Sequence, residues 1–237
     1  MHWLSNNSPK GVVSGIDVLR RIKRAMVRVV LGPIRRARED SRVCKEWTKA
    51  GKPLPPPPAV KRQVVKQHAR RFRIRVFVET GTYLGDMVHA VRNIFVRIYS
   101  IELSPDLYRK AQGRFAGCRH IVLIQGDSGK LLKDILQKVA EPCLFWLDGH
   151  YSAGETAKGE ADTPPWQELS SIAGHRLALR HVILIDDARH FTGQGDYPTV
   201  QAIESMARSL GYDRVVVEDD IIRIHASRHA GRRCWRG

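Results

Sequence analysis

Short apolar segments alternate with helical segments between residues 74 and 226. Five of them come first, IRVFVE, RIYSIE, HIVLIQGD, CLFWLD and HVILIDD, and RVVVE and IIRIHA follow. Apolar strands separated by helices favour a parallel sheet that is covered by helices on both faces. The last two segments meet at EDD, which leaves no room for a helix and predicts an antiparallel hairpin at the sheet edge. The predicted fold class is α/β, with a mostly parallel seven-stranded sheet and an antiparallel C-terminal hairpin.

The positive charge of the chain is concentrated at its two ends. The net charge is +16, and residues 1–70 carry 17 lysines and arginines against four acidic residues. Residues 227–237 carry four arginines and no acid, whereas residues 71–226 are nearly neutral, with 19 basic and 20 acidic side chains. We therefore expect a basic N-terminal region over residues 1–70, a central domain over residues 71–226 and a basic tail over residues 227–237.

The basic N-terminal region contains two recognisable segments, a predicted helix and a proline-rich linker. Apolar residues recur every three or four positions from Ile16 to Ile34 with arginines between them, which predicts a basic amphipathic helix near residues 16–38. The segment KPLPPPPAV, residues 52–60, is expected to be an extended linker. We expect the helix to attach the protein to a polyanion, an anionic membrane surface in preference to nucleic acid. The alternative is that its apolar stripe packs on the central domain.

Other features exclude broad classes of protein. No uninterrupted apolar run approaches the roughly 20 residues that cross a bilayer, and the N-terminus lacks the pattern of a secretory signal. The four cysteines, Cys44, Cys118, Cys143 and Cys234, have no metal-ligand or redox spacing and are predicted to be reduced thiols. We expect a cytoplasmic protein, with peripheral membrane attachment as the alternative.

An acidic residue stands at the end of each of the first five predicted strands. These residues are Glu79, Glu102, Asp127, Asp148 and the pair Asp186 and Asp187. Ligands of open parallel sheets bind outside the carboxyl ends of the strands. Gly81 and Gly85 follow the first strand and allow a close backbone approach, and a carboxylate on the next strand can accept both hydroxyls of a ribose. Helix capping competes as an explanation at Asp127, but the whole series favours a nucleoside site.

The spacing ExGxxxG differs from the GxGxxG of dinucleotide sites, and Glu79 would repel a diphosphate. A cofactor with a ribose, an amino group and a positive sulfonium suits a carboxylate better, which points to S-adenosylmethionine (SAM). With VETGTYLG, YSIELS and IQGDS in this order, residues 74–226 resemble the class I SAM-dependent methyltransferases. That resemblance implies a Rossmann-like fold whose seventh strand is antiparallel.

The resemblance also implies roles for particular residues. Glu79 and Gly81 would line the methionine and ribose end of SAM, and Glu102 would bind the ribose hydroxyls. Asp127 and Ser128 would contact the adenine. The full expected set of cofactor-binding residues is Glu79, Thr80, Gly81, Tyr83, Gly85, Glu102, Asp127, Ser128 and Asp148.

A metal site is expected beside the cofactor. Asp148, Asp186 and Asp187 end neighbouring strands, and three converging carboxylates would repel one another unless a cation neutralised them. Oxygen ligands suit Mg²⁺. The placement is similar to that of the macrocin-type sugar O-methyltransferases, which implies a small-molecule or glycan acceptor whose hydroxyl the ion activates. Asp148, and His150 after it on an expected exposed loop, are the expected catalytic residues. The alternative is that one of the paired aspartates caps the next segment and the other binds Arg189.

Two further functions remain open from the residues. One is a metal-independent methyltransferase that acts on another acceptor, including RNA. The other is a non-catalytic module that its basic ends attach to a polyanion.

Overall fold

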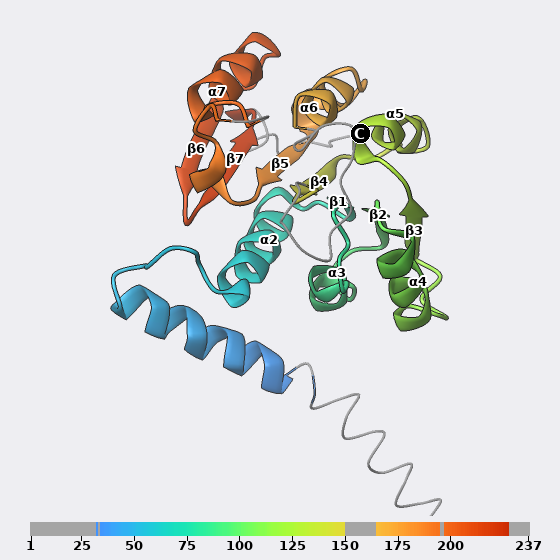
Figure 1. Cartoon of the computed structure of the whole chain (residues 1–237), viewed down its shortest axis with the longest axis vertical. Helices are drawn as coiled ribbons and strands as arrows, with labels where there is room; N and C mark the ends of the chain where they lie inside the picture. The colour runs from blue at the N-terminus through green and yellow to red at the C-terminus, as the bar shows by residue number, and fades with distance from the viewer. Residues whose placement is uncertain (1–31, 33, 150–164, 195–196, 228–237) are drawn as a thin grey trace, which may run out of the picture.

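The computed structural model describes residues 32, 34–149, 165–194 and 197–227 (Figure 1). Seven strands form one sheet in the order β3-β2-β1-β4-β5-β7-β6. Strands β1 to β5 are parallel, and β7 is antiparallel to both β5 and β6. The strands are β1 Val76–Thr80, β2 Arg97–Glu102, β3 Ile121–Gln125, β4 Cys143–Leu147, β5 Val182–Ile185, β6 Arg214–Glu218 and β7 Ile221–His225. The predicted fold class is confirmed.

Helices cover both faces of this sheet (Figure 1). Helices α2, α3 and α4 share one hydrophobic cluster with the sheet, and α5, α6 and α7 share another. The helices are α2 Pro58–Phe72, α3 Asp86–Val91, α4 Pro105–Arg114, α5 Ser128–Gln137, α6 Pro165–Ala173 and α7 Val200–Ser209, with short 3₁₀ helices η1 Ala178–Arg180 and η2 Ala188–His190. In β1, Phe77 belongs to the first cluster, and Val76 and Val78 belong to the second. Both faces of the central strands are buried, which explains why their sequences are continuously apolar.

The proline-rich linker is shorter than expected. Helix α2 begins at Pro58, and Pro57 before it has an extended backbone with φ −63° and ψ 151°. Proline suits the first helical position because the N–H that it lacks would have no partner inside the helix. The expectation of an extended segment over residues 52–60 is therefore wrong after Pro57. Helix α2 spans residue 70 and buries Val64 and Val65 against the sheet.

A further helix over residues 34–49 is attached to α2. Its Asp40 carboxylate accepts hydrogen bonds from Arg62 at 2.5 and 3.2 Å and lies 3.7 Å from Lys66 Nζ. Its Trp47 is buried, and the indole N–H donates to the carbonyl of Pro53 at 2.8 Å. The side chains on this helix that face α2 therefore make it part of the folded domain.

Several expectations fall wholly or mostly outside the described residues. The amphipathic helix near residues 16–38 is described only at its end, where Ile34 is 48% exposed. Of the basic tail, only Ser227 is described. No helix in the described part of the chain is both long and apolar enough to cross a membrane.

Candidate active site

The acidic strand ends are brought together at one edge of the sheet. In the register of the sheet, Thr80 of β1 pairs with Ile101 of β2 and with Leu147 of β4, and Leu147 pairs with Ile185 of β5. The chain runs from β1 outward to β3 on one side and continues from β4 to β5 on the other. Strands β1 and β4 therefore flank the point where the strand order reverses, which is the usual ligand position in such sheets.

The turn after β1 packs its backbone directly against the loop after β4. Gly81 has φ +85°, and a Cβ at this position would lie 2.4 Å from the carbonyl oxygen of Asp148. The N–H groups of Gly81 and Thr82 both donate to the carbonyl of Ile101, at 2.9 and 3.1 Å, and Asp148 N–H donates to the carbonyl of Thr80 at 3.1 Å. Only glycine fits position 81 without moving one of these segments.

Glu79 is a buried carboxyl group on β1. Its Oε2 accepts a hydrogen bond from Ser100 Oγ at 2.6 Å, and Ser100 Oγ is also 2.6 Å from Thr82 Oγ1. Burial raises the pKa of the Glu79 carboxyl well above its usual range, and the hydrogen bond from Ser100 opposes this shift. The neighbouring charges of Asp148 and Glu102 raise the pKa further. A positively charged ligand group at this position would favour the ionised form of Glu79.

Glu102 connects the turn after β1 with the end of β2. Its Oε2 accepts from the N–H of Tyr83 at 2.7 Å, and its Oε1 accepts from the N–H of Ser104 at 2.9 Å. Glu102 is buried, whereas Tyr83 is 46% exposed. Because each carboxylate oxygen has about two acceptor positions, these contacts leave Glu102 able to accept hydrogen bonds from a ligand.

Asp127 and Ser128 lie at the start of α5. Asp127 caps the helix, since its Oδ1 accepts from the N–H of Gly129 at 2.9 Å. Asp127 therefore has the helix-capping role that was the alternative explanation to adenine binding. Ser128 is buried beside Gly149, where an added Cβ would lie 3.3 Å from Ser128 Oγ and 3.2 Å from Thr80 Oγ1.

Thr80 has a hydroxyl group that needs a partner. Its Oγ1 is buried and forms no hydrogen bond with any of the described residues. A buried hydroxyl without a partner costs on the order of 1–3 kcal/mol. A ligand bound at the carboxyl end of β1 would offer it one.

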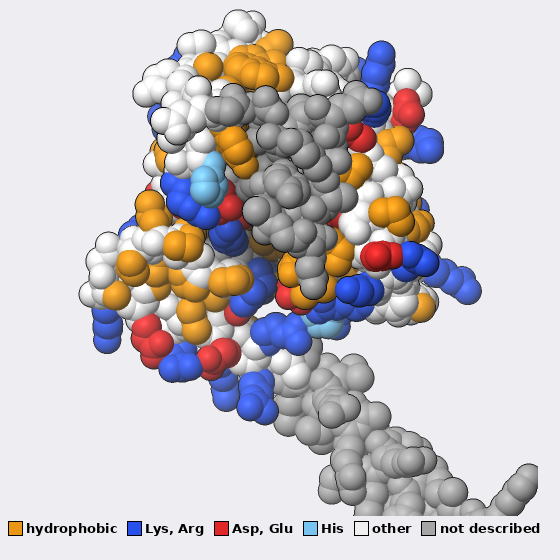
Figure 2. Space-filling model, in the orientation of Figure 1, with side chains coloured by type: hydrophobic (Ala, Val, Ile, Leu, Met, Phe, Trp, Pro, Cys, Tyr) orange, Lys and Arg blue, Asp and Glu red, His pale blue; other side chains and the backbone are white. Residues whose placement is uncertain are grey.

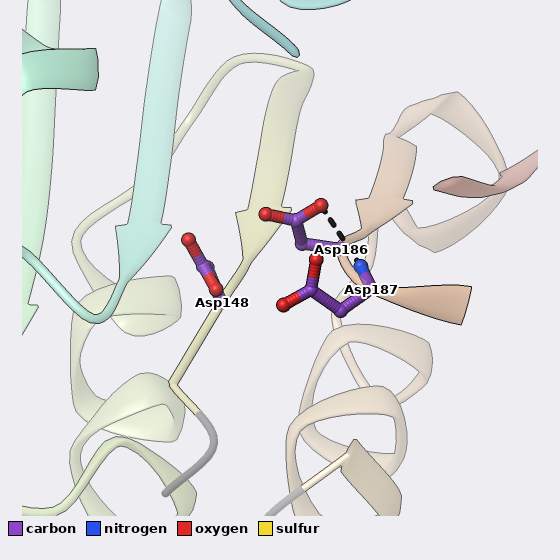
Figure 3. Close-up of side chains that lie close together, drawn as sticks. All are labelled: Asp148, Asp186 and Asp187. Carbon is purple, nitrogen blue, oxygen red and sulfur yellow. Dashed lines mark hydrogen bonds between the residues drawn. The ribbon is translucent and has the colours of Figure 1, made fainter. Parts of the chain in front are cut away.

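Asp148, Asp186 and Asp187 converge beside this turn (Figure 3). One carboxylate oxygen of each lies within 4.8 Å of the others. Asp186 is fully buried, and its Oδ1 accepts from the N–H of Asp187 at 2.8 Å. Burial and the charge of Asp148 raise the pKa of Asp186. Asp187 has a left-handed backbone with φ 52°, which turns its side chain back toward the end of β4.

Two basic side chains also reach these carboxylates. Lys61 of α2 donates to Asp186 Oδ2 at 2.6 Å and to Asp187 Oδ1 at 2.9 Å. Arg189 donates to Asp187 Oδ1 at 2.8 Å and also bonds to Asp220. The salt bridge between Asp187 and Arg189 is the contact that competed with metal binding. Lys61 was not identified from the sequence as part of the site, because Lys61 is 125 residues from Asp186 and lies in a helix with many other basic residues.

The geometry of the three carboxylates is compatible with a divalent cation. Ligand oxygens at about 2.0–2.6 Å from one ion lie no more than about 5 Å from each other, and the separation here meets that limit. Lys61 and Arg189 already offset part of the repulsion from which a metal ion was predicted, so repulsion alone does not require the ion. His150, the second expected catalytic residue, lies outside the described residues.

Known structures share this fold. A protein from Staphylococcus aureus assigned as a caffeoyl-CoA O-methyltransferase superposes with a TM-score of 0.50 at 12% sequence identity, covering 78% of this chain and 91% of that one. The S-adenosylhomocysteine-bound methyltransferase PaMTH1 of Podospora anserina also gives 0.50, at 16% identity, covering 93% of this chain and all of that one. The sequence matches no protein-family model and no curated protein. The fold is thus that of the Rossmann-like methyltransferases.

Proposed function

We propose that the protein is a SAM-dependent methyltransferase that methylates a hydroxyl of a small-molecule or sugar-containing acceptor with the help of a divalent cation. The observation that carries this proposal is the group of side chains gathered at the carboxyl ends of β1 and β4. There the buried carboxyl groups of Glu79 and Glu102 lie near the Thr80 hydroxyl, which has no partner among the described residues, and near the three converging aspartates. The shared fold of the two methyltransferase structures supports it.

The cofactor side is assigned to residues of β1, β2 and α5. SAM supplies a methyl group on a positively charged sulfur. Glu102 would accept hydrogen bonds from the ribose hydroxyls of SAM. The negative charge of Glu79 would face the amino group in the methionine part of SAM. Gly81 keeps the backbone close enough for this arrangement, and the adenine side is formed by Asp127 and Ser128.

The acceptor side is assigned to the three aspartates. Asp148, Asp186 and Asp187 would hold a Mg²⁺ ion, which when bound lowers the pKa of a hydroxyl. Asp148 connects the two sides, because its carbonyl lies against the turn at Gly81 and its carboxylate belongs to the acidic cluster. It is the proposed base and positions the acceptor hydroxyl, and His150 remains a predicted second catalytic residue. Methyl transfer requires an in-line approach at about 3 Å, so positioning contributes much of the rate.

A metal-independent methyltransferase is the second candidate. Lys61 favours it, because this side chain forms two ion pairs with the same carboxylates that would bind the metal. In this version the acceptor can be another group, including one on RNA. Attachment of the basic ends to a membrane surface or a nucleic acid stays a separate prediction under either candidate.

The proposed cofactor site predicts that Glu102→Ala weakens binding of S-adenosylhomocysteine. Loss of hydrogen bonds from a charged acceptor should cost on the order of 1.5–3 kcal/mol of binding free energy. Titration calorimetry on the full chain measures this directly. The matched control is Asp106→Ala, which removes an exposed carboxylate of α4 and should leave the affinity unchanged. Failure of the folded wild type to bind either SAM or its product, or tight binding of NAD instead, would refute the proposal.

A further inference from the structure

A basic groove lies between the helix over residues 34–49 and helices α2 and α3. Its volume is ≈ 910 Å³. Its charged lining consists of Arg36 and Asp40 from the N-terminal helix, Lys66 and Arg70 from α2, and Arg92 at the end of α3. Figure 2 shows lysine and arginine side chains gathered where the N-terminal helix meets the rest of the domain.

The positive charges in this groove are mostly unneutralised. Asp40 is the one acidic residue among its described lining, and it is already bonded to Arg62 and close to Lys66. Within the described part of the chain, Arg36, Arg70 and Arg92 form no salt bridge, and Arg92 donates only to the carbonyl of His89. Cations held together around a hollow without acidic partners raise the local concentration of anions.

This groove is separate from the candidate active site. Lys61 and Arg70 are nine residues apart on α2, which places them about 180° apart around the helix axis. Lys61 reaches Asp186 at the sheet edge, whereas Arg70 lines the groove on the opposite side of α2. A ligand in the groove would therefore not occupy the site at the strand ends.

We propose that this groove binds a small polyanion that carries clustered phosphate groups. Arginine is suited to phosphate because its planar guanidinium donates two parallel hydrogen bonds. The groove volume lies within the range of small-molecule sites. The amide side chains of Gln63, Gln67 and Asn93 add uncharged hydrogen-bonding groups to the lining.

The lining argues against two larger anionic partners. None of its described residues is Phe, Tyr or Trp, whereas single-stranded nucleic acid is usually held by bases stacked on such rings. The groove is hollow and carries few apolar residues, whereas helices that adsorb to a bilayer present an apolar face. A small ligand with clustered phosphates fits the size and the charge of the groove.

The pKa of His89 depends on the positive charges around the groove. Burial lowers the pKa of His89 to about 4, and the like charges of Arg92, Arg36 and Arg114 contribute, with Asp86 acting weakly against them. An anion bound beside these arginines would offset their charge. It should therefore raise the pKa of His89 toward its ordinary value.

Titration calorimetry of the full chain with tripolyphosphate at physiological ionic strength tests the proposal. The double variant Arg70→Ala, Arg92→Ala should bind at least about tenfold more weakly than the wild type. The matched control Lys110→Ala, Lys133→Ala removes two exposed charges outside the groove and should keep the wild-type affinity. Equal loss in both double variants would show that the probe responds to the overall charge of the chain, and no loss in either would show that it binds outside the groove. Either result would overturn the proposal.

A second measurement uses the unmodified protein and so does not depend on the folding of a variant. The NMR signals of His89, followed against pH, should show a higher pKa when tripolyphosphate is present. An unchanged pKa at saturating probe would place the anion elsewhere and reject the groove. A single-stranded RNA oligomer that binds in the groove while tripolyphosphate does not would likewise refute a small polyanion as the ligand.

Discussion

Gly81→Ala is expected to abolish binding of SAM and S-adenosylhomocysteine and to destabilise the protein. The new Cβ would meet the carbonyl oxygen of Asp148 at 2.4 Å, and the φ of +85° is one that alanine rarely adopts. Strain of this kind costs on the order of 1–3 kcal/mol, and relief requires the turn after β1 to move away from the loop after β4. Calorimetry with S-adenosylhomocysteine measures the binding, and thermal unfolding measures the stability.

Gly113→Ala is the matched control for this substitution. Gly113 lies in α4 with nothing within 4 Å of an added Cβ. Alanine favours a helix over glycine by up to about 1 kcal/mol, so this variant should be as stable as the wild type or more so, with unchanged cofactor binding. If Gly81→Ala also behaves in this way, the close packing of the turn against Asp148 is not needed for the cofactor site.

Lys61→Met is expected to cause a large loss of stability when divalent cations are chelated. Asp186 is fully buried and Lys61 is its partner at 2.6 Å, so methionine would leave a buried carboxylate without its nearest positive charge. Removal of one partner of a buried ion pair costs on the order of 3–5 kcal/mol, although partial exposure of Lys61 and protonation of Asp186 will reduce this figure. Thermal unfolding in the presence of EDTA measures the loss.

The same variant distinguishes the two candidate functions. If the three aspartates bind Mg²⁺, the ion should raise the melting temperature of Lys61→Met more than that of the wild type, because a competing cation has been removed. Lys110→Met, at an exposed position on α4, should respond as the wild type does. No effect of Mg²⁺ or Mn²⁺ on any of the three proteins, together with full methyl transfer in excess EDTA, would favour the metal-independent candidate.

Much of the fold follows from local patterns in the sequence. The segment CLFWL forms β4 with every residue buried, as its continuous apolar character predicts. The two residues between Glu218 and Ile221 leave space only for a tight turn, and the hairpin of β6 and β7 is formed there. Parallel strands present their carboxyl ends at the same edge, so the proximity of Asp148 to Asp186 and Asp187 could also be anticipated.

The partners of those carboxylates were decided by tertiary structure. Lys61 approaches Asp186 only because α2 packs antiparallel to β1 and brings its first turn to the edge where the strands end. From the sequence, Lys61 belongs only to the basic N-terminal region over residues 1–70 and has no assigned role, since a lysine among other basic residues gives no local sign of a partner 125 positions away.

The close approach at Gly81 has the same origin. The glycine and its turn are visible in the sequence, but the atom that excludes a side chain is the carbonyl of Asp148, which β4 brings next to β1. Hydrophobic periodicity and turn chemistry are short-range properties, so they determine the strands, the helices and the edge where the acidic residues gather. Which charge neutralises which carboxylate, and where the basic groove forms, depends on how distant helices pack, and that packing is specified only by the complete core.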